Sequence, residues 1–178
     1  MSVGFSRLHQ HPHHGSGILD PEELIEAEDL LKQQITVDTT HEVPFCAGMS
    51  KDGKTMYVDR KVNLKRGGMD RTKPLLVHEV TEWLYVTYFG MKYLEAHNLA
   101  LAAEEACVRA QRLDPATYNR LWDEDIRKVG SRGKYKDIPS DLQTEQYEQQ
   151  GTDEEKEEMG LLGAGAGGGK GYYGGYVG

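Results

Sequence analysis

Hydrophobic positions recur with helical spacing in four segments of the chain, and each segment carries signals for where a helix begins or ends. These segments cover residues 18–34, 73–89, 93–112 and 114–130. Pro21 and Pro115 follow Asp20 and Asp114, which is the favoured order of an N-cap residue and a first helical residue. Gly90 stands where a C-cap glycine belongs. The pattern therefore predicts four helices.

A different pattern separates the first two helices. Residues 42–64 contain two short hydrophobic stretches on either side of SKDGK, and Asp52-Gly53 is a strong signal for a hairpin turn. Residues 65–73, KRGGMDRTK, are predicted to form a loop. The order of elements predicts a small, mostly helical α+β domain with a short β-hairpin.

Composition sets the limits of this domain. Residues 1–17 are polar and rich in histidine, and we expect a flexible arm there. Residues 141–158 hold eight acidic residues and one lysine, so this segment alone carries −7 of the net charge of −8. Residues 160–178 contain ten glycines and three tyrosines, too few hydrophobic residues to offset the entropy of ordering. We therefore expect a domain over residues 18–140 and a disordered tail, first acidic and then Gly/Tyr-rich, over residues 141–178.

Several classes of protein are disfavoured by the same composition. No apolar run reaches the roughly 18 residues of a membrane span, and the N-terminus lacks the apolar region of a secretory signal. The chain has no basic face with interleaved aromatic residues, so we expect no nucleic-acid partner. Its two cysteines provide no disulfide framework. We expect a cytoplasmic protein without a membrane partner.

The segment LLVHEVTEW, residues 75–83, carries the candidate chemistry. Residues four apart lie one above the other on a helix, so His78 and Glu82 can point at a single ion. Glu79 is rotated by about 100° and would stand beside that ion. This is the arrangement in which two helical ligands hold zinc while a glutamate takes a proton from water.

The next predicted helix offers a third ligand. His97 follows Glu82 by fifteen residues, beyond the turn at Gly90 that folds this helix back on the previous one. His97, Ala100 and Glu104 share one stripe, and the alanine permits close approach. The predicted metal ligands are therefore His78, Glu82 and His97. The alternative is an amphipathic helix whose His78, Glu79 and Glu82 lie in water, although His78 sits inside an apolar run.

Three further residues are candidates for the surroundings of the metal. Glu104 can orient a ligand histidine, add a carboxylate, or pair with a basic residue on the surface. Glu105 is a second candidate of the same kind. Tyr93 can offer a hydroxyl to an oxyanion, or it can be a core residue whose hydroxyl reaches water.

The motifs HEVTE and EAHNLALAAEE resemble those of the gluzincin group of zinc metallopeptidases, in which HExxH is followed on a later helix by a glutamate. In this chain Glu82 stands at the position of the second histidine and His97 at that of the later glutamate. TMYVDRKV, residues 55–62, also resembles the substrate-aligning edge strand of those enzymes. The combination is similar to small metallopeptidase-like proteins of bacteria and phages.

Two functions are consistent with these features. The first is a zinc-dependent hydrolase, namely a peptidase with a peptide or protein substrate and with Glu79 as the general base. The second is a non-catalytic structural or interaction protein of a phage particle or another assembly, in which a metal staples two helices and the terminal arms bind protein partners. The second function implies a virion-associated location.

Overall fold

The computed structural model describes residues 34–132 and 135–144. Within these residues the chain forms the expected α+β domain of three long helices and a few short strands. The predicted helix over residues 18–34, the histidine-rich arm and most of the tail lie outside the described residues.

A three-stranded sheet precedes the helices. Its strands are β1 (Thr36–Asp38), β2 (Ala47–Met49) and β3 (Thr55–Val58). β2 and β3 form the predicted antiparallel hairpin, and Gly53 in its turn adopts a φ of 69°. β1 was not predicted, and it pairs with β3 in parallel.

The strand order β1-β3-β2 corrects the expected role of residues 55–62. β3 is paired on both sides, so it is the central strand and has no free edge onto which a peptide could add. The resemblance to a substrate-aligning edge strand is therefore wrong for this segment.

The predicted loop over residues 65–73 contains a second, very short hairpin. β4 (Lys65–Arg66) pairs with β5 (Met69–Asp70) in antiparallel fashion. Gly67 and Gly68 connect the two strands with φ angles of 65° and 76°. Two consecutive residues at positive φ are what a tight hairpin turn of this kind requires, and glycine adopts them without steric cost.

The three helices agree closely with the predicted segments. They are α2 (Thr72–Phe89), α3 (Tyr93–Ala110) and α4 (Pro115–Gly130). Gly90 caps α2 in the left-handed conformation, and the Asp114 side chain caps α4 by accepting a hydrogen bond from the Thr117 amide at 2.9 Å. None of the helices in the described ranges combines the length and apolarity needed to cross a membrane.

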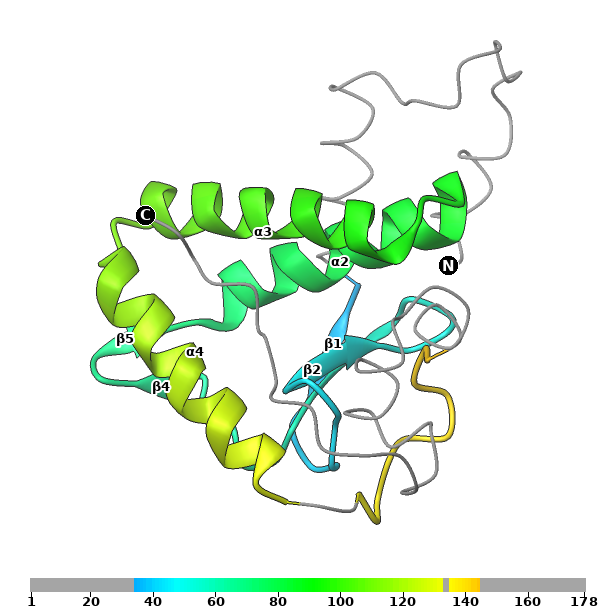
Figure 1. Cartoon of the computed structure of the whole chain (residues 1–178), viewed down its shortest axis with the longest axis horizontal. Helices are drawn as coiled ribbons and strands as arrows, with labels where there is room; N and C mark the ends of the chain where they lie inside the picture. Colours follow the sequence, from blue (N-terminus) through cyan, green and yellow to red (C-terminus); the bar gives the residue numbers. More distant parts are fainter. Residues whose placement is uncertain (1–33, 133–134, 145–178) are drawn as a thin grey trace, which may run out of the picture.

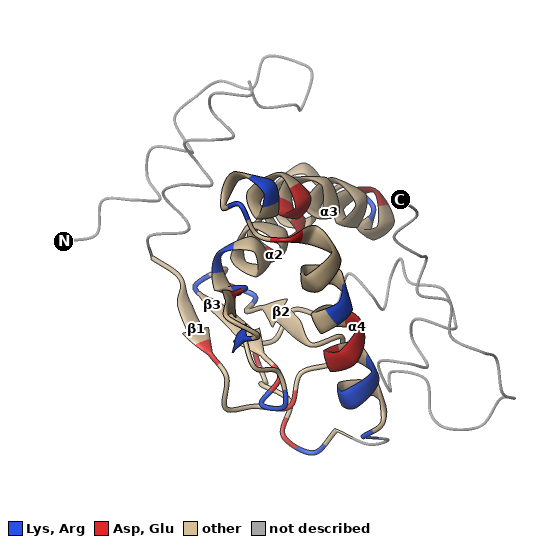
Figure 2. Ribbon diagram, turned by 90° about the vertical axis from the view of Figure 1, so that its left-hand side faces the viewer, with Lys and Arg blue, Asp and Glu red and all other residues tan. Residues whose placement is uncertain are grey.

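α2 is the centre of the molecule. It runs beside α3, with the sheet on another side and α4 crossing at one end (Figure 1). Nine of the ten residues between Leu75 and Leu84 are buried, because neighbours cover α2 on several sides. This is why the hydrophobic pattern of α2 shows no clear polar face. Acidic and basic positions alternate along the outside of α4 (Figure 2).

The expected domain boundary at residue 140 needs a correction. Leu142 is 6% exposed and packs with Val43 and Tyr57. Its neighbours bond to β2 and to the turn that follows it, since the Gln143 amide donates to the Met49 carbonyl and the Lys51 amide donates to the Asp141 carbonyl. The packed unit therefore extends at least through Gln143.

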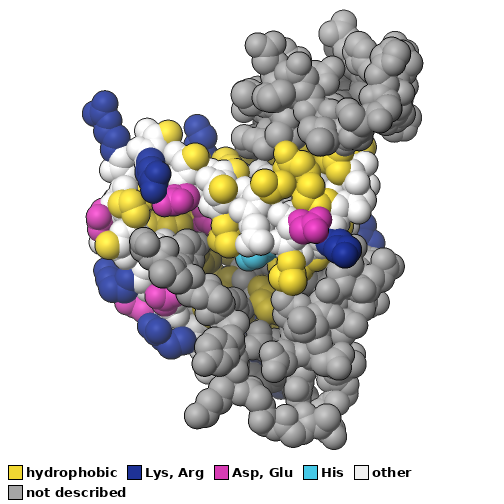
Figure 3. Space-filling model, turned by 45° about the horizontal axis from the view of Figure 1, so that its top comes forward, with side chains coloured by type: hydrophobic (Ala, Val, Ile, Leu, Met, Phe, Trp, Pro, Cys, Tyr) yellow, Lys and Arg dark blue, Asp and Glu magenta, His cyan; other side chains and the backbone are white. Residues whose placement is uncertain are grey.

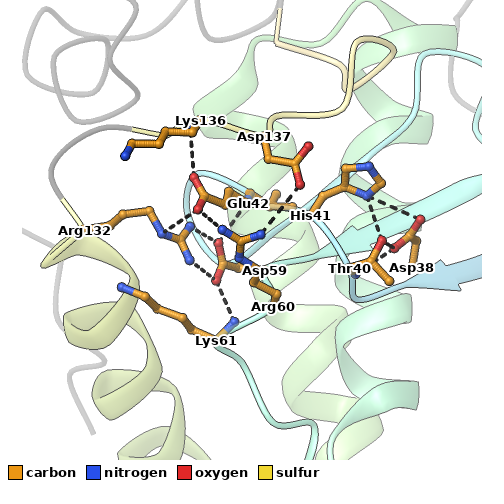
Figure 4. A network of polar contacts seen from close by, with 11 residues as sticks. Asp38, Thr40, His41, Glu42, Asp59, Arg60, Lys61, Arg132, Lys136 and Asp137 are labelled. Atoms are coloured by element: carbon orange, nitrogen blue, oxygen red, sulfur yellow. Dashed lines mark hydrogen bonds and ion pairs between the residues drawn. The ribbon is translucent and has the colours of Figure 1, made fainter.

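A network of charged side chains attaches the segment after α4 to the sheet (Figure 4). Arg132 forms ion pairs with Asp59 and with Glu42, and Asp59 is fully buried. Glu42 also accepts a hydrogen bond from the Lys136 amide at 2.7 Å. The network therefore fixes both the end of α4 and the chain that follows it.

Candidate metal centre

The structure brings together the three residues predicted as metal ligands. His78 and Glu82 on α2 and His97 on α3 offer donor atoms that all lie within 4.8 Å of one another. His78 Nε2 lies 3.6 Å from Glu82 Oε2, and His97 Nδ1 lies 2.8 Å from the same oxygen. Glu82 therefore stands between the two imidazoles.

The two helices approach closely because α3 presents small residues to α2. Ala96 and Ala100 are fully buried, one on each side of His97 in sequence. The left-handed Gly90 ends α2 and reverses the chain, so that α3 lies alongside α2. Helical spacing on α2 and small residues on α3 thus position all three side chains.

Glu104, a candidate for the surroundings of the site, orients His78. Its Oε2 lies 2.9 Å from Nδ1 of His78, and its Oε1 accepts a hydrogen bond from the hydroxyl of Tyr118 on α4. Because a carboxylate accepts, Nδ1 of His78 carries the proton and Nε2 faces Glu82. Glu104 thus contacts the histidine that the sequence predicts as a ligand.

Burial and charge act in opposite directions on the predicted ligands. Burial favours the neutral form of Glu82, but hydrogen bonds to His78 and His97 outweigh this and lower the pKa of Glu82 to about 2. Burial also disfavours the charged form of His78, yet its contacts with Glu104 and Glu82 raise the pKa of His78 well above its usual value. The cluster therefore favours an anionic Glu82 beside a positive charge on His78.

Glu79 differs from the other buried acids of the site. It is 8% exposed, and no residue in the described ranges forms a hydrogen bond with its carboxylate. Burial raises its pKa to about 8; His78 opposes the shift, and the negative charges of Glu82 and Glu104 add to it. Glu79 is thus a buried carboxyl group poised to exchange a proton near neutral pH.

Of the two remaining candidates, Tyr93 contacts the cluster and Glu105 does not. The ring of Tyr93 stacks on that of His97, with 5.5 Å between centroids. Glu105 is exposed and pairs with Arg109 at 2.5 Å, so it is not part of the cluster. His41 lies elsewhere, beside Asp38 and Thr40 (Figure 4).

Tyr118 is the one residue of this network that the sequence did not identify. Its only signal is its place on the buried face of α4, with Leu121, Trp122, Asp125 and Val129. A buried tyrosine hydroxyl requires a partner, but the sequence of α4 does not reveal which residue provides it.

The chemistry of the donor set fits a divalent transition metal. Two imidazoles and one carboxylate are ligands that zinc prefers, and three protein ligands leave a further position open. Zinc lies about 2.0–2.2 Å from such ligands, so a separation of 3.6 Å between His78 Nε2 and Glu82 Oε2 allows both to bind one ion. The side chain of His97 is 33% exposed, which gives the site an approach from solvent. Figure 3 shows a histidine side chain at the surface of this face, with hydrophobic side chains near it.

Comparison of the chain with protein-family models, with curated proteins and with solved structures finds no match.

Proposed function

We propose that the protein is a metal-dependent hydrolase, with zinc held by His78, Glu82 and His97. The observation that supports this most is Glu79, a buried carboxyl group beside the three ligands that receives no hydrogen bond from the part of the chain that the structure describes. An isolated buried carboxylate is costly and is expected where it has a chemical task. A helix with only a structural metal would gain nothing from it.

The residues divide the work as follows. A bound divalent ion would polarise a carbonyl group and acidify water. Glu79, next in sequence to a predicted ligand, would act as the general base that takes a proton from the attacking water and gives it to the leaving group. Glu104 holds His78 in place, and Tyr93 packs on His97. The choice of a peptide substrate rests on the resemblance of HEVTE and EAHNLALAAEE to the metallopeptidase motifs.

Metal binding is tested on the full chain. The four histidines of the arm, His9, His11, His13 and His14, are replaced by glutamine so that they do not chelate. We expect about one equivalent of zinc per chain, and its loss in His97→Ala but not in the matched control His41→Ala. Full occupancy in His97→Ala would exclude the ligand set.

Catalysis is tested by Glu79→Gln, which preserves shape and removes basicity. We expect this variant to bind zinc as the parent does and to lose about 100-fold or more of the cleavage rate on a peptide library, as for a removed general base. The control is Glu105→Gln, which changes an exposed glutamate and leaves the rate unaltered.

A zinc-loaded wild type without turnover, together with a silent Glu79→Gln, would favour the second function. The protein would then be a structural component of a phage particle or another assembly, with the metal joining α2 and α3 and with the terminal arms on protein partners.

A further inference from the structure

A chain of two hydrogen bonds connects α4 to the metal ligand His78. The Tyr118 hydroxyl donates to Glu104 Oε1, and Glu104 Oε2 accepts from His78 Nδ1 at 2.9 Å. Tyr118 is 2% exposed and Glu104 is 5% exposed, so the chain is shielded from water. Three helices thus contribute one residue each, although the proposed ligands lie on only two.

We propose that Tyr118 is a positioning residue of the metal site. Tyr118 acts through Glu104. This inference rests on one part of the proposed function, namely that the cluster of His78, Glu82 and His97 holds a metal. Both oxygens of Glu104 have a donor, one from α2 and one from α4, so the carboxylate is held at two points. In this position Glu104 keeps the proton on Nδ1 of His78, which leaves Nε2 to face Glu82 and His97.

The position of the hydroxyl is set by the packing of α4. The ring of Tyr118 meets Trp122 edge-on at 6.3 Å, and both side chains belong to the main hydrophobic core. Removing the hydroxyl leaves a buried carboxylate oxygen with one donor fewer, and the carboxylate is then free to turn. The direction of His78 Nε2, and with it the affinity for metal, therefore depends on how α4 docks.

The first test is a double-mutant cycle on zinc affinity, with the arm histidines replaced as above. We expect Tyr118→Phe and Glu104→Gln each to raise the zinc Kd about 10-fold or more, the range for residues that orient a ligand. The double variant should be no weaker than Glu104→Gln alone, because Tyr118 acts only through Glu104. Additive losses, or an unchanged Kd in Tyr118→Phe, would overturn the proposal.

The matched control is Tyr57→Phe. Tyr57 is also buried and also donates to a carboxylate, that of Asp141 at 2.8 Å, but this bond joins β3 to the segment after α4. Tyr57→Phe should lower stability and leave the zinc Kd unchanged. An equal rise of the Kd in both tyrosine variants would mean that zinc affinity merely follows stability, which contradicts the proposal.

The second test is the ¹⁵N spectrum of the His78 ring, which does not depend on turnover. In the zinc-loaded protein Nδ1 should carry the proton and Nε2 the metal, and Tyr118→Phe should shift the Nδ1 resonance while Tyr57→Phe does not. A proton on Nε2 in the wild type would refute the proposal. Zinc binding without cleavage would end the proposed hydrolase function but not this inference, whereas a wild type that binds no zinc would end both.

Discussion

Asp59 shows how one residue can hold together distant parts of the chain. It is fully buried at the end of β3 and accepts hydrogen bonds from the Val43 and Lys61 amides, both at 2.8 Å. It also forms an ion pair with Arg132 beyond α4. Burial alone raises the pKa of Asp59, but the hydrogen bonds from Arg132, Lys61 and Val43 outweigh burial and leave that pKa below its usual value.

A lowered pKa in the folded state predicts how stability depends on pH. The contribution of Asp59 is present above its unfolded pKa of about 3.9 and is lost as the pH falls through the folded value. Asp59→Asn should therefore cost about 3 kcal/mol near pH 7, as expected when a buried ion pair loses one partner, and less as the pH falls to 3 and below. Urea unfolding at both pH values measures this difference.

The control for Asp59→Asn is Asp123→Asn on the exposed side of α4. This change should have little effect on the free energy of unfolding at either pH. A cost of Asp59→Asn that stays the same from pH 7 to pH 3 would contradict a role for the charge of Asp59.

At the residue scale the sequence predicted only what helical spacing determines. His78 and Glu82 are four apart on one helix and His97 follows a glycine turn, so their meeting could be foreseen, and the structure brings them together. Glu104 and Glu105 are adjacent in sequence, and spacing placed only Glu104 on the stripe of His97; the structure places its carboxylate against His78. The hydrogen bond between Glu104 and Tyr118 depends on how α4 packs against α3. The sequence pattern within a single helix does not determine that packing.

At the element scale, the turn of the β2-β3 hairpin packs closely against α2. Gly53 has a φ of 69°, and a Cβ built on it would lie 2.6 Å from the ring of Trp83. Trp83 lies one helical turn after Glu79 and is 4% exposed. Gly53 is therefore required by the backbone conformation and by the packing.

Gly53→Ala should cost more than its backbone strain. The left-handed conformation costs a non-glycine residue about 1–2 kcal/mol, and overpacking against a buried ring adds about 1–3 kcal/mol. Gly68→Ala is the matched control, since Gly68 has a φ of 76° but nothing within 4 Å of its added Cβ. Thermal unfolding should show a clearly larger loss for Gly53→Ala, and equal losses would mean that Trp83 moves aside freely.

Elements with local signals were predictable, and elements that depend on distant partners were not. α3 and α4 show helical spacing, and Asp114 and Pro115 mark the beginning of α4. β1 has three residues and is a strand only because it pairs with β3, almost twenty residues later. β4 and β5 have two residues each, too few for a hydrophobic alternation to be visible.

At the scale of the whole molecule, the segment after α4 returns to the three-stranded sheet and packs along the edge formed by β2. The Gln143 amide bonds to Met49 at the end of β2, the Asp141 carbonyl bonds to Lys51 in the turn after β2, and the hydroxyl of Tyr57 donates to the Asp141 side chain. Leu142 lies so close to Gly48 that a Cβ there would be 2.9 Å from Leu142 Cδ1. Composition had suggested that this segment belongs to the acidic tail, because Asp141 begins the run of acidic residues.

The end of the folded unit can be located by two truncations. A chain that ends at Thr144 retains Asp141, Leu142 and Gln143, and it should unfold with the same free energy as the full chain. A chain that ends at Ser140 loses the buried Leu142 and leaves the Tyr57 hydroxyl and the edge of β2 without these partners. We expect this chain to lose about 2–4 kcal/mol, in the range of a large-to-small core substitution.

Leu142→Ala in the full chain should account for most of that loss, because the edge hydrogen bonds are replaced by bonds to water. Urea unfolding of the four proteins measures each step, and equal stability of the Ser140 and Thr144 chains would show that the packing of Leu142 contributes nothing.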